Sequence, residues 1–187
     1  MRRYHATEQM MPNEFPVPMS PVTVREIDQL QPAEIDDLCE VLIACVDDGA
    51  SLGFHAPLSP GIARAWWERL PRPGVTLLVA EADGRIGGTV QLHAAESANG
   101  AHRTEIAKVL VHPAWRRRGV ASSLLIAAEE IARQQGKLLM VLDTREGDPS
   151  NLLYGSVGYT QGGRIPDWAR DAAGELTATI FWYKQLA

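Results

Sequence analysis

The sequence predicts one domain of mixed α and β structure, and three observations support this. Its 187 residues suit a single domain that is large enough to bury a core. The apolar run 105–111 is rich in β-branched residues and predicts a strand, and apolar residues recur at helical spacing from Leu124 onward. Two further apolar runs, 75–81 and 85–93, flank an Asp-Gly tip, which is a strong hairpin signal.

The other elements follow from the same periodicities and from the prolines and glycines that end each run. A first strand is expected at 22–27, and Pro32 opens a helix that runs to about residue 47. A loop and a second helix follow, and Pro71 stops that helix. The remaining expected elements are a helix that ends near residue 136, a buried strand at 138–143, a short helix at 148–156 and final strands at 159–165 and 176–184.

The first 21 residues are expected to stand apart from this domain. They carry four prolines and show neither helical nor strand periodicity. We therefore expect a disordered or loosely ordered N-terminal lead-in at 1–21, followed by the domain at 22–187.

Composition excludes several classes of protein. The net charge of −5 argues against a general nucleic-acid binder, and no apolar run approaches the roughly 20 residues that a membrane-spanning helix needs. The N-terminus lacks the apolar core of a secretory signal. Cys39 and Cys45 would point to nearly opposite sides of one helix, as expected for free thiols in a reducing compartment. We therefore expect a cytoplasmic protein without nucleic-acid or membrane partners.

The turn after the strand 105–111 has the chemistry of a polyphosphate site. Arg116, Arg117 and Arg118 lead into Gly119 and the small residues that open the next helix. The first N–H groups of a helix lack partners and lie at the positive end of its dipole, and a glycine lets the backbone approach an anion. Arginine side chains donate well to phosphate oxygens. The alternative is a basic helix start that faces solvent.

The spacing of Arg116, Gly119 and Ala121 after an apolar strand resembles the acetyl-CoA motif of the GNAT superfamily of N-acetyltransferases. Glu105 and Tyr154 also fall where that family has functional residues. Together, in this order along the chain, these features resemble the superfamily more closely than the arginine turn does alone.

Within the superfamily, the sequence looks most like the tabtoxin-resistance acetyltransferase group, on the segments 49–54, 142–144 and 177–184. The resemblance covers about residues 22–186 and implies a GNAT-like fold of the α/β (α+β) class. That fold has a mixed, mostly antiparallel central sheet of about seven strands flanked by about four helices. A splayed parallel pair lies between its fourth and fifth strands.

The resemblance also implies a site for acetyl-CoA. A bulge at 109–111 would free backbone N–H groups for the pantetheine, with the N–H of Leu110 beside the thioester oxygen. Where the family has an asparagine, this sequence has Gly147. The residues expected to contact the cofactor are Val109, Leu110, Val111, Arg116, Arg117, Arg118, Gly119, Val120, Ala121, Ser122 and Tyr154.

Acetyl transfer to an amine needs a base, because an alkyl amine with a pKa of about 10 is neutral in only ~0.1% of molecules at pH 7. That deficit adds about 4 kcal/mol to the barrier. Glu105 is the first candidate for the general base, with Asp143 and Asp48 in reserve. The alternative for Glu105 is a surface carboxylate that pairs with Arg103 or Lys108.

By the resemblance, Tyr154 would be the general acid beside the sulfur of CoA. A pKa of about 10 for a phenol against about 8.5 for a thiol makes full proton donation mildly uphill. Hydrogen bonding to the departing thiolate is therefore the role we expect. The alternative is a tyrosine packed at the edge of the sheet.

The acceptor is expected to be a primary amine of a small amino-acid-like or toxin-like molecule. The helix–loop–helix segment would line its site, and the candidate contacts are Asp48, Ser51, Phe54, Trp67 and Asp143. The alternative for Phe54 and for one tryptophan is a place in the core. His93 and His112 have no partners at metal-ligand spacing, so no metal site is expected.

Other interpretations stay open at this point. The acceptor could instead be a protein lysine or an N-terminal amine, or the chain could be a non-catalytic CoA-binding module. The apolar side chains at 180–182 also leave a homodimer open.

Overall fold

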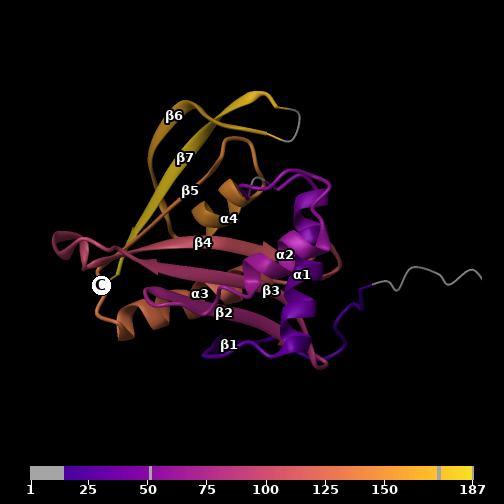
Figure 1. Ribbon diagram of the computed structural model, residues 1–187. Coiled ribbons are helices and arrows are strands. Elements are labelled where there is room, and N and C mark those ends of the chain that lie inside the picture. Colours follow the sequence, from indigo (N-terminus) through magenta and orange to yellow (C-terminus); the bar gives the residue numbers. More distant parts are fainter. Residues whose placement is uncertain (1–14, 51, 172–173, 187) are drawn as a thin grey trace, which may run out of the picture.

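The computed structural model describes residues 15–50, 52–171 and 174–186. Within them, seven strands form one sheet in the order β1-β2-β3-β4-β5-β7-β6, flanked by four α-helices (Figure 1). The strands are β1 (Thr23–Ile27), β2 (Val75–Ala82), β3 (Arg85–Ala94), β4 (Arg103–Val111), β5 (Leu139–Arg145), β6 (Thr160–Arg170) and β7 (Leu176–Gln185). The helices are α1 (Pro32–Asp47), α2 (Pro60–Trp67), α3 (Val120–Gln134) and α4 (Ser150–Ser156), with 3-10 turns at Ala98–Gly100 and Pro113–Trp115.

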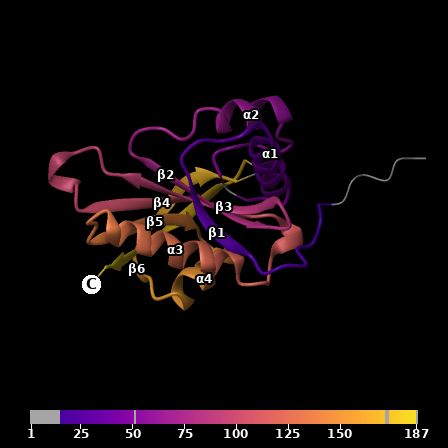
Figure 2. The same cartoon turned by 90° about the horizontal axis from the view of Figure 1, so that it is seen from below.

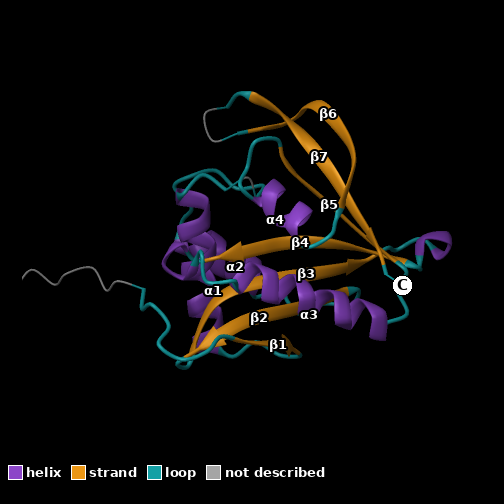
Figure 3. Ribbon diagram, turned by 180° about the vertical axis from the view of Figure 1, so that it is seen from behind, coloured by secondary structure: helices purple, strands orange, loops and turns teal. Residues whose placement is uncertain are grey.

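The sheet is divided by its parallel pair, β4 and β5. These strands pair from Arg103↔Leu139 to Glu105↔Val141, and the other neighbouring strands of the described sheet run antiparallel. Beyond that pairing β5 diverges from β4, so that β5, β7 and β6 rise away from the β1–β4 half (Figures 1 and 3). The expected mixed sheet with a splayed parallel pair is therefore confirmed.

The helices cover the two faces of the sheet as separate pairs. Seen from below, α1 and α2 lie on one side, and α3 and α4 lie on the other (Figure 2). Leu38 and Leu42 of α1, like Leu124 and Leu125 of α3, have no exposed surface. Burying aliphatic side chains from both helix layers against the sheet contributes roughly 1.5–3 kcal/mol for each side chain.

Local sequence explains where the helices begin. Pro32 occupies the first position of α1, where its missing N–H costs nothing, and the Glu34 carboxylate accepts the backbone N–H of Gln31 at 2.7 Å. The hydroxyl of Ser59 accepts the N–H of Ile62 and caps α2.

The segment from Phe15 to Pro21 is held against the domain. The Phe15 ring is buried, and Nε1 of Trp115 donates a 2.7 Å hydrogen bond to the carbonyl of Pro16. The N–H of Met19 donates to the carboxylate of Asp83 at 2.7 Å.

These contacts correct the expectation of a loosely ordered lead-in over 1–21. Its residues 15–21 are anchored, while residues 1–14 lie outside the described part of the chain. The sequence analysis weighed the prolines of this segment and did not consider Phe15, whose buried ring holds residues 15–21 against the domain. None of the helices in the described residues is long and apolar enough to span a membrane.

Candidate active site

A β-bulge shapes β4 where it leaves β5. In the β3–β4 register Gln91 pairs with Ala107 and Thr89 pairs with Leu110, so that Lys108 and the next residue both face a single residue of β3. Lys108 has a φ of +51°, in the left-handed region that favours glycine. The resemblance implied a bulge over 109–111, and the structure places it about one residue earlier.

The turn before α3 is open to an incoming anion. Gly119 caps the helix with a φ of +79°, and a Cβ on this residue would meet no atom within 4 Å. Arg117 and Arg118 are exposed. A hollow of about 350 Å³ lies beside this turn, lined by Arg118, Val120, Ser123 and the segment 18–22. Free helix N–H groups, open space and two exposed guanidinium groups fit the diphosphate of CoA.

Arg116 differs from its two neighbours in its contacts. Its guanidinium donates to the carbonyl of Val111 at 3.2 Å and forms an ion pair with Asp48. The structure thus joins a residue expected at the cofactor to one expected at the acceptor. The sequence analysis expected Arg116 to contact the cofactor and Asp48 to contact the acceptor, whereas in the structure these two side chains contact each other.

The buried side chain of Trp115 anchors the start of this turn in the core. Its ring lies so close to Gly87 that a Cβ there would stand 2.1 Å from the ring carbon Cδ2. The neighbouring His112 ring stacks on Phe15 with centroids 3.8 Å apart, and its Nδ1 accepts the N–H of Ala114 at 3.2 Å. Burial is the main cause that lowers the pKa of His112, and the charges of Arg116 and Arg85 lower it further. The neutral ring, which can accept this hydrogen bond, is therefore favoured.

The candidate bases lie on one face of the sheet. Glu105 is paired with Val141, and side chains two residues apart on a strand share a face, so Asp143 lies on the same face as Glu105. Partial desolvation raises the pKa of Glu105, the Asp143 carboxylate raises it further, and Lys108 lowers it. Asp143 accepts a 2.8 Å hydrogen bond from the hydroxyl of Thr179. The negative charge of Asp143 therefore acts on Glu105 across this face.

Tyr154 projects from α4 and is almost fully buried. Its ring packs against Tyr159 and Trp182, with centroids 6.0 and 6.3 Å away. Burial raises its pKa far above the ordinary value, and Asp143 and Asp148 raise it further. The phenol therefore stays protonated at physiological pH, as a hydrogen-bond donor must.

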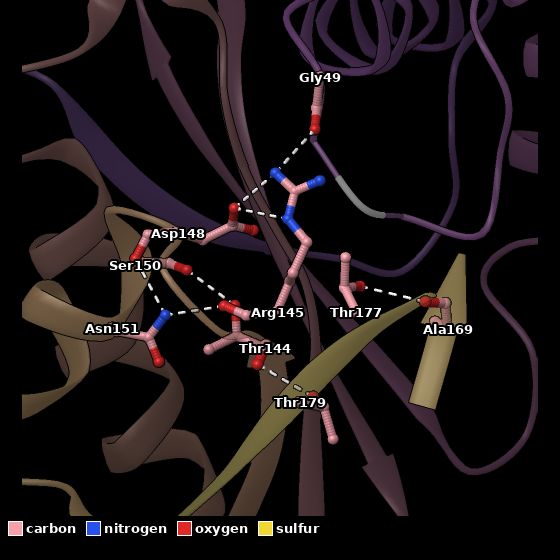
Figure 4. A network of polar contacts seen from close by, with 9 residues as sticks. All are labelled: Gly49, Thr144, Arg145, Asp148, Ser150, Asn151, Ala169, Thr177 and Thr179. Carbon is pink, nitrogen blue, oxygen red and sulfur yellow. Dashed lines mark hydrogen bonds and ion pairs between the residues drawn. The ribbon is translucent and has the colours of Figure 1, made fainter. Parts of the chain in front are cut away.

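A polar network fixes α4 to the end of β5 (Figure 4). Arg145 donates to Asp148 at 2.6 Å and to the carbonyl of Gly49 at 3.3 Å. The amide of Asn151 donates to the carbonyls of Arg145 and Asp148, and its oxygen accepts Nε1 of Trp182. All polar atoms of the Asn151 side chain are thus used in support of the fold.

Gly147, at the position where the family pattern has an asparagine, lies in the turn between β5 and α4. Gly147 has a φ of +85°, a backbone conformation that a residue with a Cβ adopts at a cost. The turn therefore suits a glycine, but asparagine also tolerates a positive φ, so the backbone alone does not account for the change.

Phe54, in the loop between α1 and α2, and Trp66, on α2, form an aromatic wall beside Lys108. The two rings meet edge to face with centroids 6.1 Å apart, and both are partly exposed. Trp67 has no exposed surface and belongs to the core, so the structure does not place it where an acceptor could contact it, whereas Trp66 is partly exposed. Ser51, also expected there, lies outside the described residues.

The structure brings two residues to this region that the sequence analysis did not name as site candidates, Lys108 and Trp66. Lys108 lies at the bulge of β4, which the strand periodicity does not reveal. Ala63 and Trp67 form the buried face of the short helix α2, which leaves Trp66 partly exposed. Among the described residues, no group of three metal-ligating side chains is close enough to hold an ion.

Comparison with known proteins agrees with this arrangement. The sequence model of the acetyltransferase (GNAT) family matches residues 22–159. An uncharacterized N-acetyltransferase from the hisH–hisA intergenic region of Azospirillum brasilense is 35% identical over 131 residues, which cover 68% of this chain and 78% of that protein. The L-methionine sulfoximine/L-methionine sulfone acetyltransferase of Salmonella typhimurium is 30% identical over 103 residues, covering 54% of this chain and 60% of that protein.

Solved structures share the fold. The Salmonella typhimurium protein yncA, solved with its cofactor acetyl-CoA, has a TM-score of 0.73 and 24% identity over 89% of this chain and 94% of its own. An N-acetyltransferase from Staphylococcus aureus has a TM-score of 0.77 and 15% identity over 90% of this chain and 100% of its own.

The fold, the open turn before α3 and the family match define an acetyl-CoA-dependent N-acetyltransferase. The chain belongs to the GNAT family of acetyltransferases.

Proposed function

We propose that the protein transfers the acetyl group of acetyl-CoA to the primary amine of a small amino-acid-like or toxin-like molecule. The observation that carries this proposal is the gathering of three groups at the β4–β5 splay. Glu105 is the last residue of β4 that pairs with β5, and Asp143 lies two residues beyond its partner Val141. Tyr154 is near enough to Asp143 for that carboxylate to raise its pKa.

The class of acceptor is supported by one relative. The Salmonella typhimurium relative is named for L-methionine sulfoximine and L-methionine sulfone, which are small amino acids with an α-amine. On the same ground we place the chain near the tabtoxin-resistance group, as the segments 49–54, 142–144 and 177–184 suggest.

For the cofactor, we assign the diphosphate to Arg117, Arg118 and the first N–H groups of α3. Gly119 leaves the space for it, and Val120, Ala121 and Ser122 present the helix backbone. Acetyl-CoA supplies the activated acetyl group, and the N–H groups of 109–111 would orient its pantetheine arm and polarise the thioester. Arg116 acts here by holding Asp48 and the end of β4.

Glu105 is the proposed base, acting directly or through a water. Partial desolvation and the Asp143 carboxylate raise the pKa of Glu105, which makes the carboxylate a stronger proton acceptor than an ordinary glutamate. Asp143 shares its face and is the reserve base, whereas the ion pair with Arg116 removes Asp48 from that role.

Tyr154 is the proposed acid. Its phenol donates a hydrogen bond to the sulfur as negative charge develops there, and burial strengthens such a bond because little water competes for it.

The experiment that tests the proposal combines binding with turnover. Calorimetry with CoA measures the cofactor site, and release of the CoA thiol measures transfer to a panel of amino acids, their analogues and lysine peptides. Binding with transfer to small amines supports the proposal. Transfer only to peptides would assign a protein acceptor, and binding without transfer to either would indicate a non-catalytic module.

A further inference from the structure

Lys108 has contacts that the proposed chemistry does not use. It lies at the bulge of β4, and its Nζ donates a 2.7 Å hydrogen bond to the backbone carbonyl of Leu52, in the loop between α1 and α2. The same Nζ lies 5.8 Å from the ring centroid of Phe54 and 5.7 Å from that of Trp66. One ammonium group, carried by β4, therefore contacts both the α1–α2 loop and α2.

The position is strained and partly desolvated. A non-glycine residue at a φ of +51° is unfavourable in an ordinary strand, so the surrounding contacts must hold it there. Burial lowers the pKa of Lys108, while Glu105 and Asp143 raise it. The charges of Glu105 and Asp143 thus act on the ammonium, and its hydrogen bond to Leu52 is charge-assisted.

We propose that Lys108 is a positioning residue, which fastens the loop of residues 52–58 and the Trp66 face of α2 onto the β4 bulge. This inference rests on the proposed function, because it assigns that loop to the acceptor. The bulge also carries the backbone expected to face the thioester. Lys108 therefore sets the distance between the acceptor wall and the reacting strand, and it acts on acceptor binding without touching the reacting atoms.

The test uses Lys108→Met, which keeps the aliphatic stem and removes the ammonium, together with Lys108→Arg, which keeps a cation. Lys137→Met is the matched control, because Nζ of Lys137 also donates to a loop carbonyl, that of Ala101, at 2.8 Å. Each variant is measured for the KM of the acceptor, the KM of acetyl-CoA and backbone hydrogen exchange in residues 52–58.

The proposal predicts that Lys108→Met raises the acceptor KM by about ten-fold, the loss expected for one charge-assisted hydrogen bond, and leaves the acetyl-CoA KM within about two-fold. Hydrogen exchange in 52–58 should accelerate by a similar factor, Lys108→Arg should recover part of both effects, and Lys137→Met should change neither. An unchanged acceptor KM with unchanged exchange in 52–58 would overturn it, as would an equal rise of both KM values.

Two further measurements keep the inference separate from the proposed function and from misfolding. Hydrogen exchange needs no substrate, so loosening of 52–58 in the Lys108 variant supports the fastening role even if no amine is acetylated, and unchanged exchange refutes it. Phe54→Leu removes the ring on the loop side and leaves β4 intact, so it should loosen the same segment. Unchanged exchange in this variant would count against the role of the aromatic contact.

Discussion

Arg116 and Asp48 form an ion pair that joins the turn before α3 to the end of α1. The consecutive arginines of the turn therefore divide between two tasks. All three side chains are exposed, but Arg116 is held by Asp48 and by the carbonyl of Val111, and we propose that Arg117 and Arg118 bind the cofactor. This division makes the proposed cofactor site testable residue by residue.

Replacing Arg117 and Arg118 together by glutamine should weaken CoA binding by about ten- to a hundred-fold, since charge-assisted bonds contribute roughly 1.5–3 kcal/mol each and exposure reduces that. The loss should shrink at high salt. Calorimetry with CoA measures it, with Arg69→Gln, an exposed arginine at the end of α2, as control. Equal affinity in the double variant and in the native protein would exclude these arginines from the site.

Glu105→Gln should lower kcat by roughly a hundred- to ten-thousand-fold, the usual contribution of a general base. A base acts in its deprotonated form, and the raised pKa of Glu105 means that protonation begins at a higher pH than for an ordinary glutamate. Activity of the native protein should therefore fall with decreasing pH, in an acid limb that lies at a higher pH than an ordinary glutamate would give, and the variant should lack that limb.

The control for this experiment is Glu96→Gln, at an exposed carboxylate in the turn before β4. A pH–rate profile of each protein decides the matter. If the acid limb persists in the Glu105 variant, the base is another group, and Asp143→Asn is the next variant to measure.

Tyr154→Phe should lower kcat by about ten- to a hundred-fold and leave the affinity for CoA nearly unchanged, because the hydrogen bond to sulfur strengthens only as the thiolate forms. Single-turnover kinetics separate that step from binding. Tyr183→Phe, at an exposed tyrosine of β7, controls for loss of a phenol elsewhere. A kcat within two-fold of the native value would assign Tyr154 to packing alone.

Gly87→Ala should destabilise the protein by about 1–3 kcal/mol, because the new methyl would stand 2.1 Å from the Trp115 ring and force that ring to move. Urea unfolding measures the loss. Gly61→Ala is the matched control, since a Cβ there meets nothing within 4 Å and lies in the first turn of α2. Equal stability of the two variants would show that Trp115 is not tightly held.

Much of the fold was predictable because the signals are local. Proline and glycine end each run, the Asp-Gly tip fixes the β2–β3 hairpin, and the resemblance on Arg116, Gly119 and Ala121 supplied the topology. Local patterns do not report contacts between distant segments. Nothing near Phe15 in the sequence indicates the Trp115 and His112 rings that bury it.

The candidate site was harder to predict for the same reason. Three adjacent arginines are chemically alike, and only the position of Asp48 selects Arg116 for an ion pair. The eight-residue helix α2 is too short for its periodicity to show which tryptophan faces the core. The sequence analysis therefore chose Trp67 as a candidate contact, whereas the structure buries it and leaves Trp66 partly exposed. The bulge at Lys108 interrupts the two-residue alternation of side chains along β4. Strand alternation in the sequence does not show where such a bulge lies.

The most direct test of the whole account is the release of CoA thiol from acetyl-CoA in the presence of small amino-acid analogues, with native protein and with Glu105→Gln side by side. We predict steady turnover by the native protein, acetylation of the α-amine by mass spectrometry, and a rate at least about a hundred-fold lower in the variant. Binding of CoA without turnover on any amine, or turnover that the variant retains in full, would contradict it.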